Sequence, residues 1–158
     1  MLIFLDTEFT DFIDCDLISI GMVTEDGQHV FYAERNDYKR EWESDFVRAS
    51  VLPHVGKVPA AVCSRDELTQ RLWNWFSTLP GQLQIACDSV HDKDLLWGAL
   101  GDGLPPNLSA AHKEIAFLAE TPAFRNAASR YYQQEGYPLH HALHDAQALR
   151  HGWLASEK

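Results

Sequence analysis

Two carboxylates lie close together near the start of the chain. Asp6-Thr7-Glu8 directly follows residues 2–5, an apolar run that predicts a strand buried on both faces. Because side chains alternate along a strand, Asp6 and Glu8 point the same way, with about 6.6 Å between their backbone positions. Carboxylates at that spacing can converge on hard cations such as Mg²⁺. An Asp-x-Glu tripeptide alone is more often an exposed acidic turn, but here no Lys or Arg precedes Arg35 to offset the charge, which favours a metal site.

A second polar group lies near the C-terminal end, where His140 precedes Asp145 by five residues. On one continuous helix these two side chains would diverge by about 140°. They can converge if His140 lies in a loop and Asp145 in the first turns of a helix, which Pro138 favours. Taken by itself, the segment is most simply a solvated helix start. A zinc site built on His140, His141 and His144 is the alternative, but no Cys or further His stands at supporting spacing.

Three aspartates in the middle of the chain follow the strand predicted at residues 82–87. Asp88, Asp92 and Asp94 come just where a helix is expected to begin. A helix N-terminus favours negative charge, so each of them could be only a capping or first-turn acid. The residues alone do not decide which of the three takes part in chemistry.

The elements that must position these groups predict an α/β fold. Strands are expected at residues 17–23 and 29–33, joined as a hairpin by a turn at residues 25–27. The capping box Ser64-x-x-Glu67 predicts a helix that ends at Pro80. Further helices are expected near residues 95–100, 121–136 and 142–155; residues 34–63 show only one helical turn before Pro53, and residues 115–118 fit a strand or a helix. We therefore expect one domain, residues 1–158, with a mixed sheet (antiparallel hairpin plus parallel strands) covered by helices.

Composition narrows the class of protein. The net charge of −10 argues against tight binding of nucleic acid, although a site for two divalent cations must be acidic before the ions bind. Cys15, Cys63 and Cys87 have no metal-type spacing and predict reduced thiols in a cytoplasmic protein. The sequence holds no apolar run of membrane-spanning length and no basic segment that would make the N-terminus a signal peptide, so we expect no membrane partner.

The three acidic stretches, in this order, resemble the motifs of the DEDD exonuclease superfamily in its histidine-containing (DEDDh) branch. Leu-Asp-Thr-Glu-Phe-Thr resembles the first motif and His-x₄-Asp at His140–Asp145 resembles the third. When residues 87–96 are aligned with the second motif, Cys87-Asp88 replaces the usual His-Asn pair and His91 replaces an aromatic residue. Asp92 keeps the family spacing and the apolar pair after it, so it is favoured over Asp88 as the middle acid. The chain is also similar to compact stand-alone bacterial and phage exoribonucleases, which have a ribonuclease-H-like exonuclease fold.

That resemblance implies a 3′→5′ exonuclease that hydrolyses single-stranded or 3′-overhang nucleic acid, RNA favoured, to nucleoside 5′-monophosphates. It implies two Mg²⁺ or Mn²⁺ ions per active site, one bound by Asp6, Glu8 and Asp145 and the other by Asp6 and Asp92. His140 would accept a proton from the attacking water. A proofreading exonuclease acting on DNA and an inactive ribonuclease-H-like binding module are the alternatives.

The substrate contacts expected from the resemblance lie beside the first motif. Backbone N–H groups near Thr7 and Phe9 would contact the terminal sugar, and Phe9 and Phe12 are the candidates for stacking on a base. Phe12 by itself is more often a core residue. Exonucleases of this type often form homodimers, for which the sequence carries no interface signature.

Overall fold

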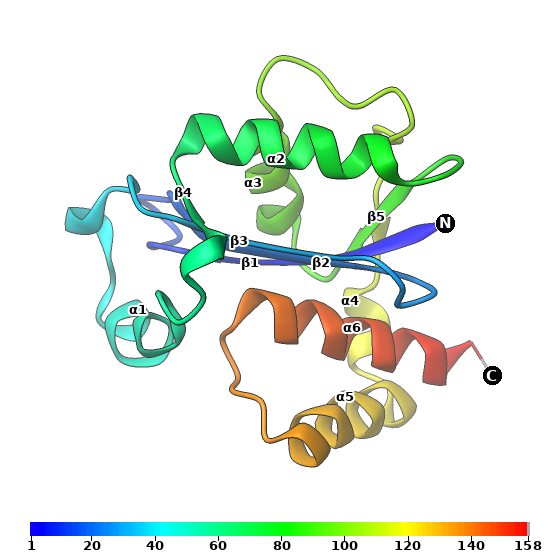
Figure 1. Ribbon diagram of the computed structural model, residues 1–158. Coiled ribbons are helices and arrows are strands. Elements are labelled where there is room, and N and C mark those ends of the chain that lie inside the picture. Colours follow the sequence, from blue (N-terminus) through cyan, green and yellow to red (C-terminus); the bar gives the residue numbers. More distant parts are fainter. Residues whose placement is uncertain (158) are drawn as a thin grey trace.

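The structure, a computed structural model, describes residues 1–157; Lys158, the last residue of the predicted domain, lies outside them. The fold is α/β, with a six-stranded mixed sheet between helices (Figure 1). The strand order is β4-β3-β2-β1-β5-β6. The strands are β1 Leu2–Phe9, β2 Leu17–Thr24, β3 Val30–Arg35, β4 Val62–Cys63, β5 Gln84–Cys87 and β6 Lys113–Glu114.

Strand pairing confirms the predicted mixed sheet. The pairs β1–β2 and β2–β3 are antiparallel, whereas β1–β5, β3–β4 and β5–β6 are parallel. One expectation was wrong: the first strand does not end at residue 5. Asp6 pairs with Gly21 and Glu8 with Ser19, so both acids lie inside β1 because the ladder with β2 continues past them.

Helices cover both faces of the sheet. Figure 1 shows the sheet edge-on, with α2 (Arg65–Thr78) and α3 (Val90–Leu100) on one side and α4 (Ala116–Ala119), α5 (Pro122–Glu135) and α6 (Ala142–Ser156) on the other. The short helix α1 (Asp45–Ser50) and the 3₁₀ turns η1 (Arg40–Trp42), η2 (Leu52–His54) and η3 (Pro59–Ala61) connect β3 to β4. Within residues 1–157, no helix combines the length and apolar character needed to cross a membrane.

Side-chain caps explain where two of the helices begin. The capping box is confirmed: the Ser64 hydroxyl accepts from the Glu67 N–H, and the Glu67 carboxylate accepts from the Ser64 N–H. Helix α3 begins among the three aspartates, as expected, because the Ser89 hydroxyl accepts from the His91 N–H. That start places Asp92 in the first turn of α3, next to the sheet.

Side chains on the two faces of β1 pack into two different hydrophobic cores. Ile3 and Leu5 pack into the core beneath α2 and α3, whereas Phe4 packs against α5 and α6, with its ring centroid 6.2 Å from that of Trp153. All three side chains are fully buried, as the apolar run predicted. Because side chains alternate, Asp6 and Glu8 lie on the face of Phe4, toward α6.

A glycine lets α6 approach this face closely. A Cβ atom on Gly21 would lie 2.3 Å from the backbone carbonyl carbon of Ala142, a distance that no real contact allows. Since Gly21 is also the partner of Asp6 across the β1–β2 ladder, the first turn of α6 lies directly over the acidic end of β1.

Candidate metal centre

The predicted acids converge from three parts of the chain. Potential ligand atoms of Glu8, His140 and Asp145 all lie within 4.8 Å of one another. A second such group consists of Asp6, Asp88 and Asp92. The end of β1, the segment after β5 and the start of α6 thus meet at one place, as the resemblance to the three motifs implied.

Sheet topology accounts for the second group. β5 runs parallel to β1 with Ala86 opposite Phe4, so the residue that follows β5 emerges beside Asp6. Asp88 stands at that position, and Asp92 follows one turn later on α3. The choice between Asp88 and Asp92 is therefore not exclusive, because both carboxylates reach Asp6.

Asp92 and Asp145 are held by hydrogen bonds. Each of these two carboxylates accepts from one hydroxyl and one backbone amide. Asp92 Oδ1 accepts from the Thr7 hydroxyl (2.6 Å) and from the Thr7 N–H (3.1 Å). Asp145 Oδ1 accepts from the Tyr132 hydroxyl (2.5 Å), and Asp145 Oδ2 accepts from the His140 N–H (3.1 Å). Among residues 1–157, by contrast, no hydrogen-bond donor contacts the carboxylate of Asp6 or Glu8. Their oxygens remain available to an ion.

Burial and mutual repulsion disfavour the ionised forms of these acids. The pKa of Asp6 is raised well above its ordinary value, first by burial and then by the charges of Asp92 and Asp145. The pKa of Glu8 rises to about 8 for the same reasons, and burial raises the pKa of Asp92 to about 7. None of the ion pairs found in the described part of the chain involves these acids. Oxygen ligands without a protein cation are the set that Mg²⁺ or Mn²⁺ prefers, so the residues fit such ions.

His140 has an unusual backbone conformation. Its φ of 59° is the single positive φ of a non-glycine residue within residues 1–157. Such conformations are uncommon for residues with a Cβ and gather at functional sites. The residue lies before α6 begins, as predicted, and its ring meets Phe46 edge-on with centroids 4.9 Å apart.

A cavity of about 530 Å³ opens over the acids. Its wall includes three aromatic side chains, Phe9, Phe12 and Phe46. Phe12 is 72% exposed, so it is not a core residue; its ring and that of Phe9 pack against His91, with the Phe9 and His91 rings stacked 5.8 Å apart. Phe46 was missed from the sequence because residues 34–63 gave no periodic signal.

Thr7 lines the cavity, but its two hydrogen-bond donors are already in use. Its side chain is buried, and both its N–H and its hydroxyl are engaged by Asp92. Thr7 therefore contacts a candidate ligand, whereas the sequence had suggested a contact with the substrate.

The histidines that suggested zinc are packed as aromatic residues. His141 stacks on Tyr32 with centroids 4.6 Å apart, and His144 stacks on Tyr137 at 3.9 Å while its Nδ1 bonds the Tyr131 hydroxyl at 3.0 Å. Burial, followed by the neighbouring His141, lowers the pKa of His144 to about 4, which keeps this ring neutral. Neither His141 nor His144 joins a potential metal-ligand group in residues 1–157.

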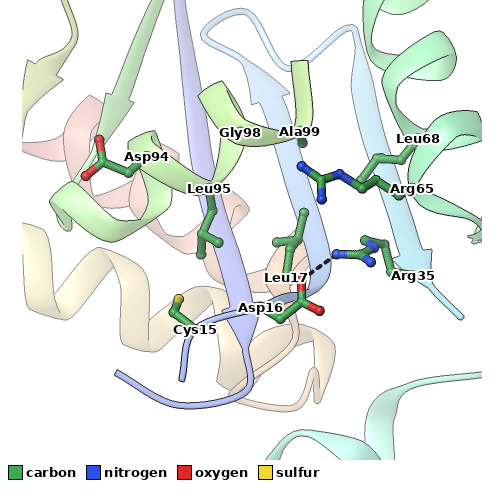
Figure 2. A pocket seen from close by; sticks show the side chains of 10 residues that line it. All are labelled: Cys15, Asp16, Leu17, Arg35, Arg65, Leu68, Asp94, Leu95, Gly98 and Ala99. Carbon is green, nitrogen blue, oxygen red and sulfur yellow. Dashed lines mark hydrogen bonds and ion pairs between the residues drawn. The ribbon is translucent and has the colours of Figure 1, made fainter. Parts of the chain in front are cut away.

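A smaller cavity of about 200 Å³ lies between α3 and the segment that leads into β2 (Figure 2). Figure 2 shows the guanidinium groups of Arg35 and Arg65 along one wall and the Cys15 thiol across from them. Arg35 is already paired with Asp16 (2.6 Å) and with Asp37 (2.9 Å). The two carboxylates therefore offset the charge of Arg35. The acidic cavity, in contrast, contains both groups of potential metal ligands, so it is the candidate functional site.

No protein-family model matches this chain, and no curated protein matches it.

Proposed function

We propose that this chain is a metal-dependent 3′→5′ exonuclease of the DEDDh type, with a ribonuclease-H-like fold. The observation that carries the proposal is the convergence of Asp6, Glu8, Asp92, His140 and Asp145 on one cavity. Their sequence motifs resemble that family, and their spacing in the fold suits the chemistry that the motifs imply.

Two divalent cations fit the two groups of ligands. Glu8 and Asp145 would hold one ion, and Asp6 and Asp92 the other, with Asp88 as a further oxygen ligand. Asp6 is also close enough to Glu8 and Asp145 for their charges to raise its pKa. Mg²⁺ or Mn²⁺ bound there would supply Lewis acidity, which activates water and stabilises charge on the leaving 3′ oxygen. The acids would hold such ions with little rearrangement, because Thr7 orients Asp92 and Tyr132 orients Asp145.

His140 is the proposed general base. A nitrogen of its ring lies within 4.8 Å of carboxylate oxygens of both Glu8 and Asp145. A water bound to an ion on these carboxylates would therefore lie near the ring. The hydrogen bond from its own backbone N–H to Asp145 fixes the turn that presents the ring. In this role His140 takes the proton of the water as the hydroxide attacks the last phosphate.

The aromatic wall supports a nucleic-acid substrate. Phe12 and Phe46 are exposed and line the same cavity as the acids, which suits stacking on the terminal base. With a net charge of −10, the chain is suited to brief, metal-dependent binding of a strand end, and we favour short single-stranded or 3′-overhang RNA.

The test is digestion of labelled single strands with Mg²⁺ or Mn²⁺. Wild-type protein should release nucleoside 5′-monophosphates from the 3′ end, and Asp6→Ala should abolish that release. Asp94→Ala is the matched control, because Asp94 is exposed on α3 and pairs with Lys93. Loss of activity in both variants, or in neither, would contradict the assignment. RNA and DNA of one sequence separate the exoribonuclease from a DNA exonuclease, and Mn²⁺ binding without hydrolysis would indicate a binding module.

A further inference from the structure

The hydroxyl of Tyr132 contacts the acidic cluster from a helix that supplies none of the proposed ligands. Tyr132 lies on α5, and its phenol oxygen is 2.5 Å from Asp145 Oδ1. Burial, followed by the charge of Asp145, raises the pKa of Tyr132 above its ordinary value, so the phenol stays protonated. The O–H therefore donates and the carboxylate accepts.

This contact completes the hydrogen bonding that orients Asp145. Oδ1 accepts from Tyr132 and Oδ2 accepts from the His140 N–H, so each oxygen has one donor and the carboxylate plane is fixed. A carboxylate oxygen has two lone pairs, which leaves one on each oxygen for an ion. On Asp92 the Thr7 hydroxyl and N–H both bond Oδ1 and leave Oδ2 without a donor among residues 1–157, so the two carboxylates that come from helices are both oriented by a hydroxyl, though with different geometry.

Tyr132 contacts Asp145 from outside the cavity proposed for the substrate. The wall of that cavity does not include it; it lines a separate crevice of about 230 Å³, which Asp6 and Asp145 also line. The crevice is formed between α5 and α6, whose packing is close: a Cβ on Gly152 of α6 would lie 2.5 Å from the Phe124 ring of α5. Tyr132 thus contacts Asp145 from the α5 side, whereas the proposed substrate cavity opens on the side of the cluster formed by its aromatic wall residues Phe9, Phe12 and Phe46.

We infer that Tyr132 is a positioning residue, which holds the Asp145 carboxylate in the orientation needed to share a divalent cation with Glu8. This inference rests on the proposed function, because it requires that the acids bind an ion. Hydrogen-bond partners of metal ligands typically change metal affinity or activity by about 10- to 100-fold when they are removed.

The experiment compares Tyr132→Phe with Tyr131→Phe by calorimetric titration with Mn²⁺ alone. Both changes remove one phenol hydroxyl from α5, but the Tyr131 hydroxyl bonds His144 and touches no acid of the cluster. Tyr132→Phe should weaken Mn²⁺ binding by about 10- to 100-fold, and Tyr131→Phe should leave it at the wild-type value. The exonuclease rate of Tyr132→Phe should fall at low Mn²⁺ and recover as Mn²⁺ approaches saturation.

A second pair of variants tests whether Tyr132 acts through Asp145. In an Asp145→Asn background, adding Tyr132→Phe should cause no further loss of Mn²⁺ affinity. An equal loss in both backgrounds overturns the inference, as does a Tyr132→Phe protein that melts at a lower temperature but binds Mn²⁺ like wild type. Wild-type protein that neither binds Mn²⁺ nor degrades nucleic acid overturns the proposed function as well, whereas an active wild type with an unaffected Tyr132→Phe variant overturns this inference alone.

Discussion

Stability of the metal-free protein should fall as pH rises from 6.5 to 8. Burial and neighbouring charges raise the pKa of Glu8 from 4.5 to about 8, so in this range folded Glu8 keeps a proton that the unfolded chain has lost. The free energy of unfolding then falls with pH by about 1.4 kcal/mol per unit for each such proton. Glu8 alone accounts for a loss of about 2 kcal/mol across the window, and Asp6, whose pKa is also raised, acts in the same direction.

The choice of window limits an opposing effect of the histidines. Burial lowers the pKa of His144 from 6.5 to about 4, and those of His54, His141 and His151 are lowered as well. Below pH 6.5 the unfolded chain binds protons that these folded histidines do not, so they make stability rise with pH. At pH 6.5 about half of the unfolded histidines still carry a proton, and about a tenth do one unit higher, so their effect fades across the window while that of the carboxylates persists.

Urea unfolding at several pH values, in EDTA or in excess Mn²⁺, measures this dependence. In EDTA the slope should be negative, and Glu8→Gln should reduce it by about 1.4 kcal/mol per pH unit. In Mn²⁺ the slope should become positive, because the ion binds the ionised carboxylates and its affinity grows as protons leave. Free energy in EDTA that is flat or rises with pH, or a Glu8→Gln slope equal to that of wild type, would refute the buried, cation-free carboxylate cluster.

The remaining predictions concern packing and the substrate. Gly21→Ala should lower the free energy of unfolding by about 3 kcal/mol or more, because its Cβ would clash with the Ala142 backbone at 2.3 Å; Gly98→Ala, in an open helical position, should stabilise by up to about 1 kcal/mol, and urea unfolding measures both. Phe46→Ala should raise KM for a short RNA through the loss of about 1–3 kcal/mol of base stacking without changing Mn²⁺ affinity. Phe117→Ala, which removes an exposed aromatic ring away from the cavity, is its control in steady-state kinetics, and equal effects of the two changes would argue against stacking on Phe46.

Local rules in the sequence were enough to predict most of the elements. The apolar run before Asp6, the hairpin turn and the Ser64 capping box each depend on residues close together in the chain, and the structure confirms them. Alternation along a strand also predicted that Asp6 and Glu8 share a face. The two-residue strands β4 and β6 were not predicted, since such short segments are defined by the strand they pair with and carry no pattern of their own.

Contacts between distant elements could not be predicted from the sequence. Phe46 reaches the cavity because α1 packs beside the sheet, with Val47 buried next to Ile18. Tyr132 precedes Asp145 by 13 residues and meets it only because α5 folds back along α6. Their positions depend on how helices pack in three dimensions, and no residue spacing within either segment indicates an approach to the acids.

The crossing of α6 over β1 also has a consequence for the order of synthesis. Asp6 and Glu8 are made first, but Asp145 comes from the last helix, which rests on Gly21 and the strand beside it. A ribosome-bound chain that has not yet released residue 145 has β1 and its two acids without their partner. A nuclease with this layout would remain inactive until residue 145 has left the ribosome and α6 has packed against β1.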